Sequence, residues 1–157
     1  SFLANCPFTT IHKLTIGEFY TLLGELNPDV IEQVRCLSIS PTRYNIALSF
    51  VQFAKEFGIA PKTMTLNIED RKELNRICYT GTSVAQRSAS SDIEVVCNDS
   101  TLQIMPSQTG NVSLSYRFHL DFQEELPVFL ENIPGLLMKK IFLRLKNYLE
   151  NDIQNDS

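Results

Sequence analysis

The stretch from Gly110 to Pro127, GNVSLSYRFHLDFQEELP, alternates between apolar and polar residues over most of its length. Successive side chains of a β-strand point to opposite faces, so this pattern predicts a strand with one buried and one solvated face. Its apolar face consists of Val112, Leu114, Tyr116, Phe118, Leu120 and Phe122. Its polar face consists of Ser113, Ser115, Arg117, His119 and Asp121. The apolar face must be covered, either by a filled core or by a wall of a ligand cavity.

Shorter stretches in the middle of the chain show the same alternation, at 64–68, 77–79, 93–97 and 102–104. We expect turns at 98–100 and 106–110 and a polar loop at 82–91. The charged run 69–73 reads as a solvated hairpin turn or strand end. Together these segments predict an antiparallel meander.

Two other stretches carry apolar residues at helical spacing. Thr15 and Glu18 form the pattern of a capping box at the start of a helix that Asn27-Pro28 ends. Near the C-terminus the same spacing predicts a long helix from Gly135 to Asp152, with Asn132 as its cap and Pro134 interrupting the helical pattern. Residues 8–14, before the first helix, are β-like.

The segment from Val30 to Pro61 has two interpretations. Residues 30–39 fit a strand or a short helix. Within 41–57, Tyr44, Ile46 and Leu48 alternate as in a strand, whereas Ala47, Val51 and Ala54 belong to a helical pattern. Local signals favour a helix there, and consistency with the rest of the chain favours a strand in its first half.

Composition excludes some classes of function. The chain is 43% hydrophobic and 20% charged, with a net charge of -4, as is typical of a globular domain and not of a nucleic-acid-binding one. No apolar stretch approaches the roughly 18 residues of a membrane span. The four cysteines form no CxxC pair, so we expect buried free thiols and no metal site, with two disulfides left open.

The order of elements, a short strand, a helix, antiparallel strands and a long terminal helix, resembles the START-like helix-grip (SRPBCC) superfamily. RYNIALSFVQFAKEFGIAPKTMTLNIE and the ending LDFQEELPVFLENIPGLLMKKIFLRLKNYLENDI are similar to an uncharacterised cyanobacterial and plastid family, with Ile59-Ala60-Pro61 as the matching turn. The resemblance implies an α+β fold in one START-like domain, residues 1–157. In it a curved antiparallel sheet is gripped by a long C-terminal helix, with a short N-terminal helix. No signal peptide is visible, so we expect a cytoplasmic or plastid stroma location.

Our main functional expectation is a non-catalytic cavity between the sheet and the terminal helix. It would bind or carry a small apolar molecule such as a lipid, a quinone or a tetrapyrrole-like compound, without a cofactor. Buried tyrosines favour a cavity over a filled core, because a phenol needs a polar partner. The expected lining residues are Tyr44, Leu48, Met64, Leu66, Tyr79, Tyr116, Phe118, Leu137, Ile141 and Leu145.

Two rival functions have their own residues. A protein-interaction domain with a filled core would use the basic stripe of the terminal helix, Lys139, Lys140 and Arg144. A cyclase-like enzyme would use His119 as a base beside Asp121, although no nucleophile accompanies them. We expect a non-enzyme, and we expect no nucleic-acid partner.

Overall fold

The computed structural model describes residues 2–83, 93–107 and 111–152. Its strands are β1 (Phe2–Ala4), β2 (Ile31–Ser40), β3 (Arg43–Phe50), β4 (Lys62–Glu73), β5 (Arg76–Ser83), β6 (Ile93–Glu94), β7 (Val96–Pro106) and β8 (Val112–Asp121). Its helices are α1 (Phe8–His12), α2 (Ile16–Leu26) and α3 (Ile133–Asn147). Short 3-10 turns η1 (Lys55–Phe57) and η2 (Val128–Leu130) lie in the connections, and α3 continues into a π turn, η3 (Tyr148–Asp152).

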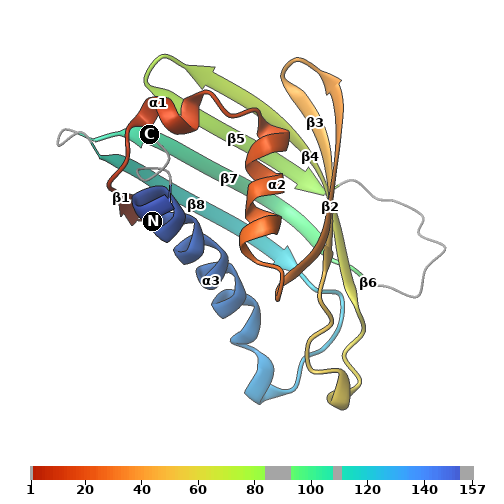
Figure 1. Ribbon diagram of the computed structural model, residues 1–157. Helices are drawn as coiled ribbons and strands as arrows, with labels where there is room; N and C mark the ends of the chain where they lie inside the picture. The colour runs from red at the N-terminus through yellow and green to blue at the C-terminus, as the bar shows by residue number, and fades with distance from the viewer. Residues whose placement is uncertain (1, 84–92, 108–110, 153–157) are drawn as a thin grey trace.

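The strands form one curved sheet in the order β1-β8-β7-β5-β4-β3-β2, with every neighbouring pair on this path antiparallel. The short β6 adds a parallel pairing to β4. Figure 1 shows α1, α2 and α3 on the same side of the sheet, with α3 beside β8. This confirms the expected α+β helix-grip architecture, because one amphipathic helix covers the apolar face of a bent antiparallel sheet.

Local sequence accounts for the two longer helices. At the start of α2 the Thr15 hydroxyl accepts from the Glu18 backbone N–H and the Glu18 carboxylate accepts from the Thr15 N–H, which is the predicted capping box. Pro134 occupies the first turn of α3, where its missing N–H has no intrahelical partner to lose. Asn132 precedes α3 as predicted, but its side chain makes no capping hydrogen bond.

Residues 41–57 are not a helix. The stretch forms β3 up to Phe50, and β3 pairs with β2 on one side and with β4 on the other. Ile46 and Leu48 are buried in the core, whereas Val51 and Phe57, which a helix would have placed on its apolar face, are exposed. The two ladders satisfy the backbone hydrogen-bonding groups of β3, and its alternating side chains become buried. This stabilisation outweighs the local preference for a helix.

Two smaller expectations were wrong. Residues 8–14 contain the helix α1 and not a strand. Phe8 and Ile11 are three residues apart, which also fits one face of a helix, and Pro7 is suited to precede a helix. The turn expected at 98–100 lies inside β7, where a register shift between Cys97 and Asp99 absorbs the irregularity. Most of the loop expected at 82–91, and 108–110 of the next turn, lie outside the described residues.

Candidate functional site: an apolar cavity under the C-terminal helix

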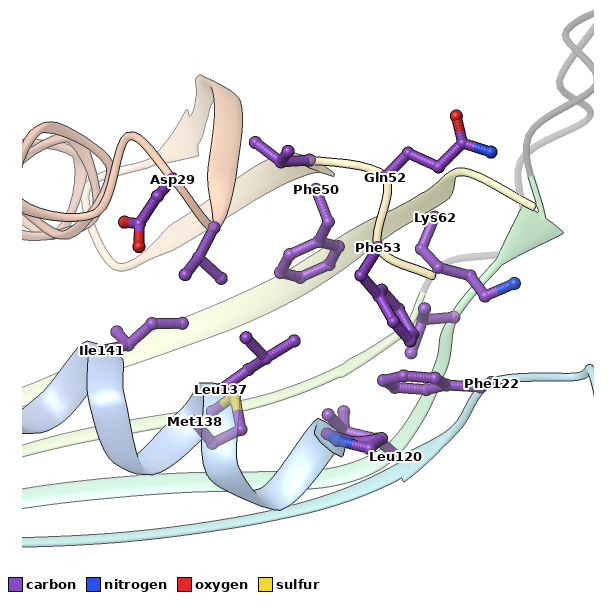
Figure 2. Close-up of a pocket in the computed structure, with 14 residues that line it drawn as sticks. Asp29, Phe50, Gln52, Phe53, Lys62, Leu120, Phe122, Leu137, Met138 and Ile141 are labelled. Carbon is purple, nitrogen blue, oxygen red and sulfur yellow. The ribbon is translucent and has the colours of Figure 1, made fainter. Parts of the chain in front are cut away.

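Two adjacent chambers, together called the cavity below, lie between the sheet and the helices α2 and α3. Figure 2 shows the outer chamber, which is lined by Asp29, Val30, Phe50, Val51, Gln52, Phe53, Lys62, Val95, Leu120, Phe122, Pro134, Leu137, Met138 and Ile141. The inner chamber is lined by Tyr20, Leu23, Ile31, Leu48, Phe50, Met64, Leu66, Leu102, Phe118, Met138, Ile141 and Phe142. The outer chamber has a volume of about 80 Å³ and the inner one a volume of about 40 Å³. Both chambers are small, and their linings are mostly apolar.

Helical periodicity explains how α3 forms one wall of the cavity. Pro134, Leu137, Met138 and Ile141 follow the spacing of residues on one helix face, and all four line the outer chamber. Met138 and Ile141 also line the inner chamber, together with Phe50 from the end of β3. These last three side chains therefore form the boundary between the two chambers.

A buried ion pair lies at the sheet end of the outer chamber. The Lys62 side chain is only 2% exposed, and its ammonium group donates to the carboxylate of Glu124, which is 20% exposed. The same carboxylate accepts a hydrogen bond from the Ala60 backbone N–H at 3.3 Å. Glu124 thus neutralises the lysine and fixes the connection between η1 and β4, as a buried charge requires.

A second ion-pair cluster joins α3 to the loop between α2 and β2. Asp29 accepts from Lys140 and from both terminal nitrogens of Arg144, and Arg144 also donates to the Asn27 side chain at 3.2 Å. The hydrogen bonds from Arg144, and then those from Lys140, hold the pKa of the Asp29 carboxyl well below its usual range. The cluster is partly exposed and fastens α3 beside the outer chamber.

Aromatic stacking fastens the middle of α3 to the sheet. The Phe142 ring is 2% exposed and stacks on Tyr116 of β8, with ring centroids 3.9 Å apart and planes 11° apart. Phe142 also lies 6.0 Å from the Phe118 ring and lines the inner chamber. This contact confirms that the terminal helix lies against the apolar face of β8.

The ten side chains that the sequence predicts as cavity lining fall into two groups. Six line the chambers: Leu48, Met64, Leu66, Phe118, Leu137 and Ile141. Four line neither of these chambers and pack in or against the core: Tyr44, Tyr79, Tyr116 and Leu145. Tyr79 is 1% exposed, its ring lies 5.6 Å from Phe19, and its hydroxyl has no hydrogen-bond partner among the described residues. Burial, and then nearby Asp70, raise the pKa of Tyr79.

Several lining residues had no signal strong enough to find them in the sequence. Phe53 and Lys62 lie in or beside an irregular connection, and the Phe53 ring lies 6.4 Å from that of Phe122. Asp29 lies between α2 and β2, far from α3 in the sequence. Met138, Leu120 and Phe122 were open to prediction, because Met138 shares the helical face of Leu137 and Ile141, and the other two belong to the alternating apolar face that begins at Val112.

The convex face of the sheet carries the predicted enzyme-like residues, away from the cavity. His119 is exposed, and its Nδ1 lies 3.8 Å from a carboxylate oxygen of Asp99, which also pairs with Arg117. Asp121 instead accepts from the Gln123 backbone N–H. The structure therefore pairs His119 with Asp99 and not with Asp121.

The cysteines are free thiols: Cys6 and Cys97 are buried, Cys78 is half-buried, and Cys36 is exposed. The expectation of burial was wrong for Cys36, because β2 is an edge strand covered only in part by α2. Across residues 2–83, 93–107 and 111–152, no three histidine, cysteine, aspartate or glutamate side chains are placed to hold a metal ion. No helix in that part of the chain has the length and hydrophobicity to cross a membrane.

The same fold occurs in solved structures. The human StarD13 (DLC2) lipid transfer and protein localization domain matches with a TM-score of 0.73 and 14% identity, over 96% of this chain and 75% of that chain. Human STARD10 matches with a TM-score of 0.71 and 8% identity, over 93% and 60%. Human StAR-related lipid transfer protein 5 matches with a TM-score of 0.66 and 15% identity, over 81% and 69%.

These matches establish a START-like helix-grip fold for this chain, which spans 60% to 75% of the lengths of these three structures. At this level of identity the likeness concerns the fold and not the ligand. No family model and no curated protein matches the sequence.

Proposed function

We propose that this chain, as a single START-like domain of residues 1–157, binds and carries a small apolar molecule between α3 and the sheet, without catalysis. The observation that carries the proposal is the pair of chambers, whose linings are almost entirely aliphatic and aromatic side chains. Sites for small molecules are typically concave, mostly apolar and supplied with few polar groups. Two of the three similar structures are named for lipid transfer, which supports the same class of ligand.

In this proposal, six of the sequence-predicted residues contact the ligand directly. They are Leu48, Met64, Leu66, Phe118, Leu137 and Ile141. Tyr44, Tyr79, Tyr116 and Leu145 support the walls from outside the chambers. Met138 joins the contact set because its flexible thioether side chain borders both chambers and can move to admit a guest.

The test is native mass spectrometry of the protein purified from its own host, with two matched variants. Met138→Trp fills the boundary between the chambers, whereas Leu143→Trp adds the same bulk to an exposed position of the same helix. We expect a co-purifying apolar molecule in the wild type and in Leu143→Trp, and its loss in Met138→Trp. Wild-type protein that carries no such molecule would contradict the proposal.

The basic stripe of α3, the rival protein-interaction surface, has less support from the structure than from the sequence. Two of its three basic residues, Lys140 and Arg144, already pair with Asp29 of the same chain. Lys139 alone has no ion pair in the described part of the chain, so a partner would have to compete with Asp29 for the other two. A location in the cytoplasm or plastid stroma, and membership of the cyanobacterial and plastid family, remain predictions from the sequence.

A further inference from the structure

We infer that the ligand is an uncharged lipid with a single unbranched chain, an inference that rests on the proposed binding function. It depends on two features of the cavity: the charges on its lining are already paired, and the side chains of Phe50, Met138 and Ile141 separate its two chambers. The first feature selects against ionised head groups. The second selects against wide, rigid molecules such as fused-ring compounds.

Only two charged side chains, Asp29 and Lys62, are among the described residues that line the chambers, and both line the outer one. Lys62 is paired with Glu124, and Asp29 is paired with Lys140 and Arg144, neither of which lines a chamber. An ionised ligand head would therefore enter a weakly polar space that offers it no free counter-charge. Burying an unpaired charge costs far more than burying a hydroxyl or a carbonyl, because the charge loses its hydration without compensation.

The dimensions of the chambers limit the shape of the ligand. A water molecule takes about 30 Å³ of liquid, so the two chambers as they stand hold roughly four water-sized groups in all, and the inner one about one. A methylene group is similar in size to a water molecule. A longer alkyl chain therefore has to enlarge this space, and a flexible chain can do so by displacing Met138, whose unbranched side chain borders both chambers.

The outer chamber alone is too small for a compact molecule with the same number of carbon atoms. To reach the inner chamber such a molecule would have to displace Phe50 and Ile141 as well as Met138, and Phe50 and Ile141 are held by β3 and by the buried face of α3. A linear chain and a cage of equal carbon count therefore separate the effect of width from the effect of hydrophobicity.

The experiment uses methionine methyl groups as reporters of position. Met64 lines the inner chamber and Met138 lines both, whereas Met105 is 41% exposed at the end of β7 and lines neither. Protein labelled with ¹³C in these methyl groups is titrated with 1-decanol, with decanoate at neutral pH, and with 1-adamantanol, which has the same number of carbons as decanol in a rigid cage.

We expect 1-decanol to shift the methyl signals of Met64 and Met138 and to leave that of Met105 unchanged. Decanoate and 1-adamantanol should each bind at least about tenfold more weakly, a difference of about 1.4 kcal/mol. In Glu124→Gln, Lys62 loses its counter-charge while the amide oxygen still accepts from Ala60, so decanoate should bind at least about tenfold more tightly than it binds the wild type. Glu125, the exposed neighbour of Glu124, provides the control: Glu125→Gln should leave the affinities for 1-decanol, decanoate and 1-adamantanol unchanged.

The outcomes separate this inference from the proposed function. Wild-type binding of decanoate or 1-adamantanol as tight as that of 1-decanol overturns the inference and leaves ligand binding intact. Glu124→Gln that folds, by its methyl spectrum, but gains no affinity for decanoate overturns the charge argument. If none of the three compounds shifts Met64 or Met138, the cavity does not bind small apolar molecules and both proposals fail.

Discussion

Replacing Phe142 with alanine tests how α3 is held against the sheet. The ring is 2% exposed and stacks on Tyr116 with centroids 3.9 Å apart. Truncating a buried phenylalanine costs about 3–5 kcal/mol of unfolding free energy. Because an aromatic pair adds about 0.5–1.5 kcal/mol beyond the buried area, we expect the loss for Phe142→Ala to lie near about 5 kcal/mol. A domain of ordinary stability, about 5–15 kcal/mol, is then strongly weakened, and one at the lower end of those values has almost no stability left.

The same substitution enlarges the inner chamber, because Phe142 lines it. A ligand that binds only the folded state stabilises it in proportion to its affinity, so 1-decanol should raise the unfolding free energy of Phe142→Ala more than that of the wild type. Urea unfolding followed by circular dichroism, with and without 1-decanol, measures both effects. Leu143→Ala, which truncates an exposed side chain on the same helix, should change stability by less than about 0.5 kcal/mol. A cost below about 1 kcal/mol for Phe142→Ala, with no added stabilisation by 1-decanol, would refute the reasoning.

Three further substitutions test other parts of the structure by urea unfolding. Gly81→Ala should lower the free energy of unfolding by about 1–3 kcal/mol, because the added methyl group would lie 2.9 Å from the Asn67 backbone oxygen. Gly135→Ala, whose methyl group would meet nothing within 4 Å in α3, should instead raise it by about 0.5–1 kcal/mol. Equal effects of the two substitutions would contradict the packing argument. Tyr79→Phe should raise stability by about 1 kcal/mol by removing a buried hydroxyl without a protein partner, and a loss would show that the hydroxyl is satisfied. Asp29→Asn should lower the free energy of unfolding at pH 7. Since the pKa of Asp29 is lower in the folded than in the unfolded protein, the extra stability of the wild type is present above the unfolded pKa of about 4 and shrinks as the pH falls below it. A stability difference that stays the same at pH 2 would contradict the ion pair of Asp29.

Local patterns predicted the elements whose determinants lie within a few residues of one another. The capping box of Thr15 and Glu18 starts α2, and period-two alternation identified β8 with its buried and exposed faces. The helical stripe near the C-terminus identified α3. The order of these elements, through its resemblance to the helix-grip superfamily, then predicted a sheet gripped by a helix.

Residues 41–57 show where local patterns were insufficient. Both a strand and a helix place apolar side chains of this segment on one face, so spacing alone could not decide between them. The ladders to β2 and β4 decide for a strand, and neither partner strand is visible from within the segment.

The cavity was predicted only in part for a related reason. Alternation shows which face of the sheet a side chain occupies, but not how far along the strand the covering helix crosses it. Tyr79 and Leu66 both face the core from neighbouring strands, yet only Leu66 lies beside the inner chamber. Lys62 and Glu124 form an ion pair beside the outer chamber, although they are far apart in the sequence. No local pattern links them, because the folded structure alone brings them together.

The central claim is that the space between α3 and the sheet holds a ligand. A crystal structure of the protein purified from its own host measures this directly. We predict continuous electron density of a chain-like molecule that passes between Phe50 and Met138 and reaches Met64. Side chains of Phe50, Met138 and Ile141 packed together, with no density in either chamber, would contradict the claim.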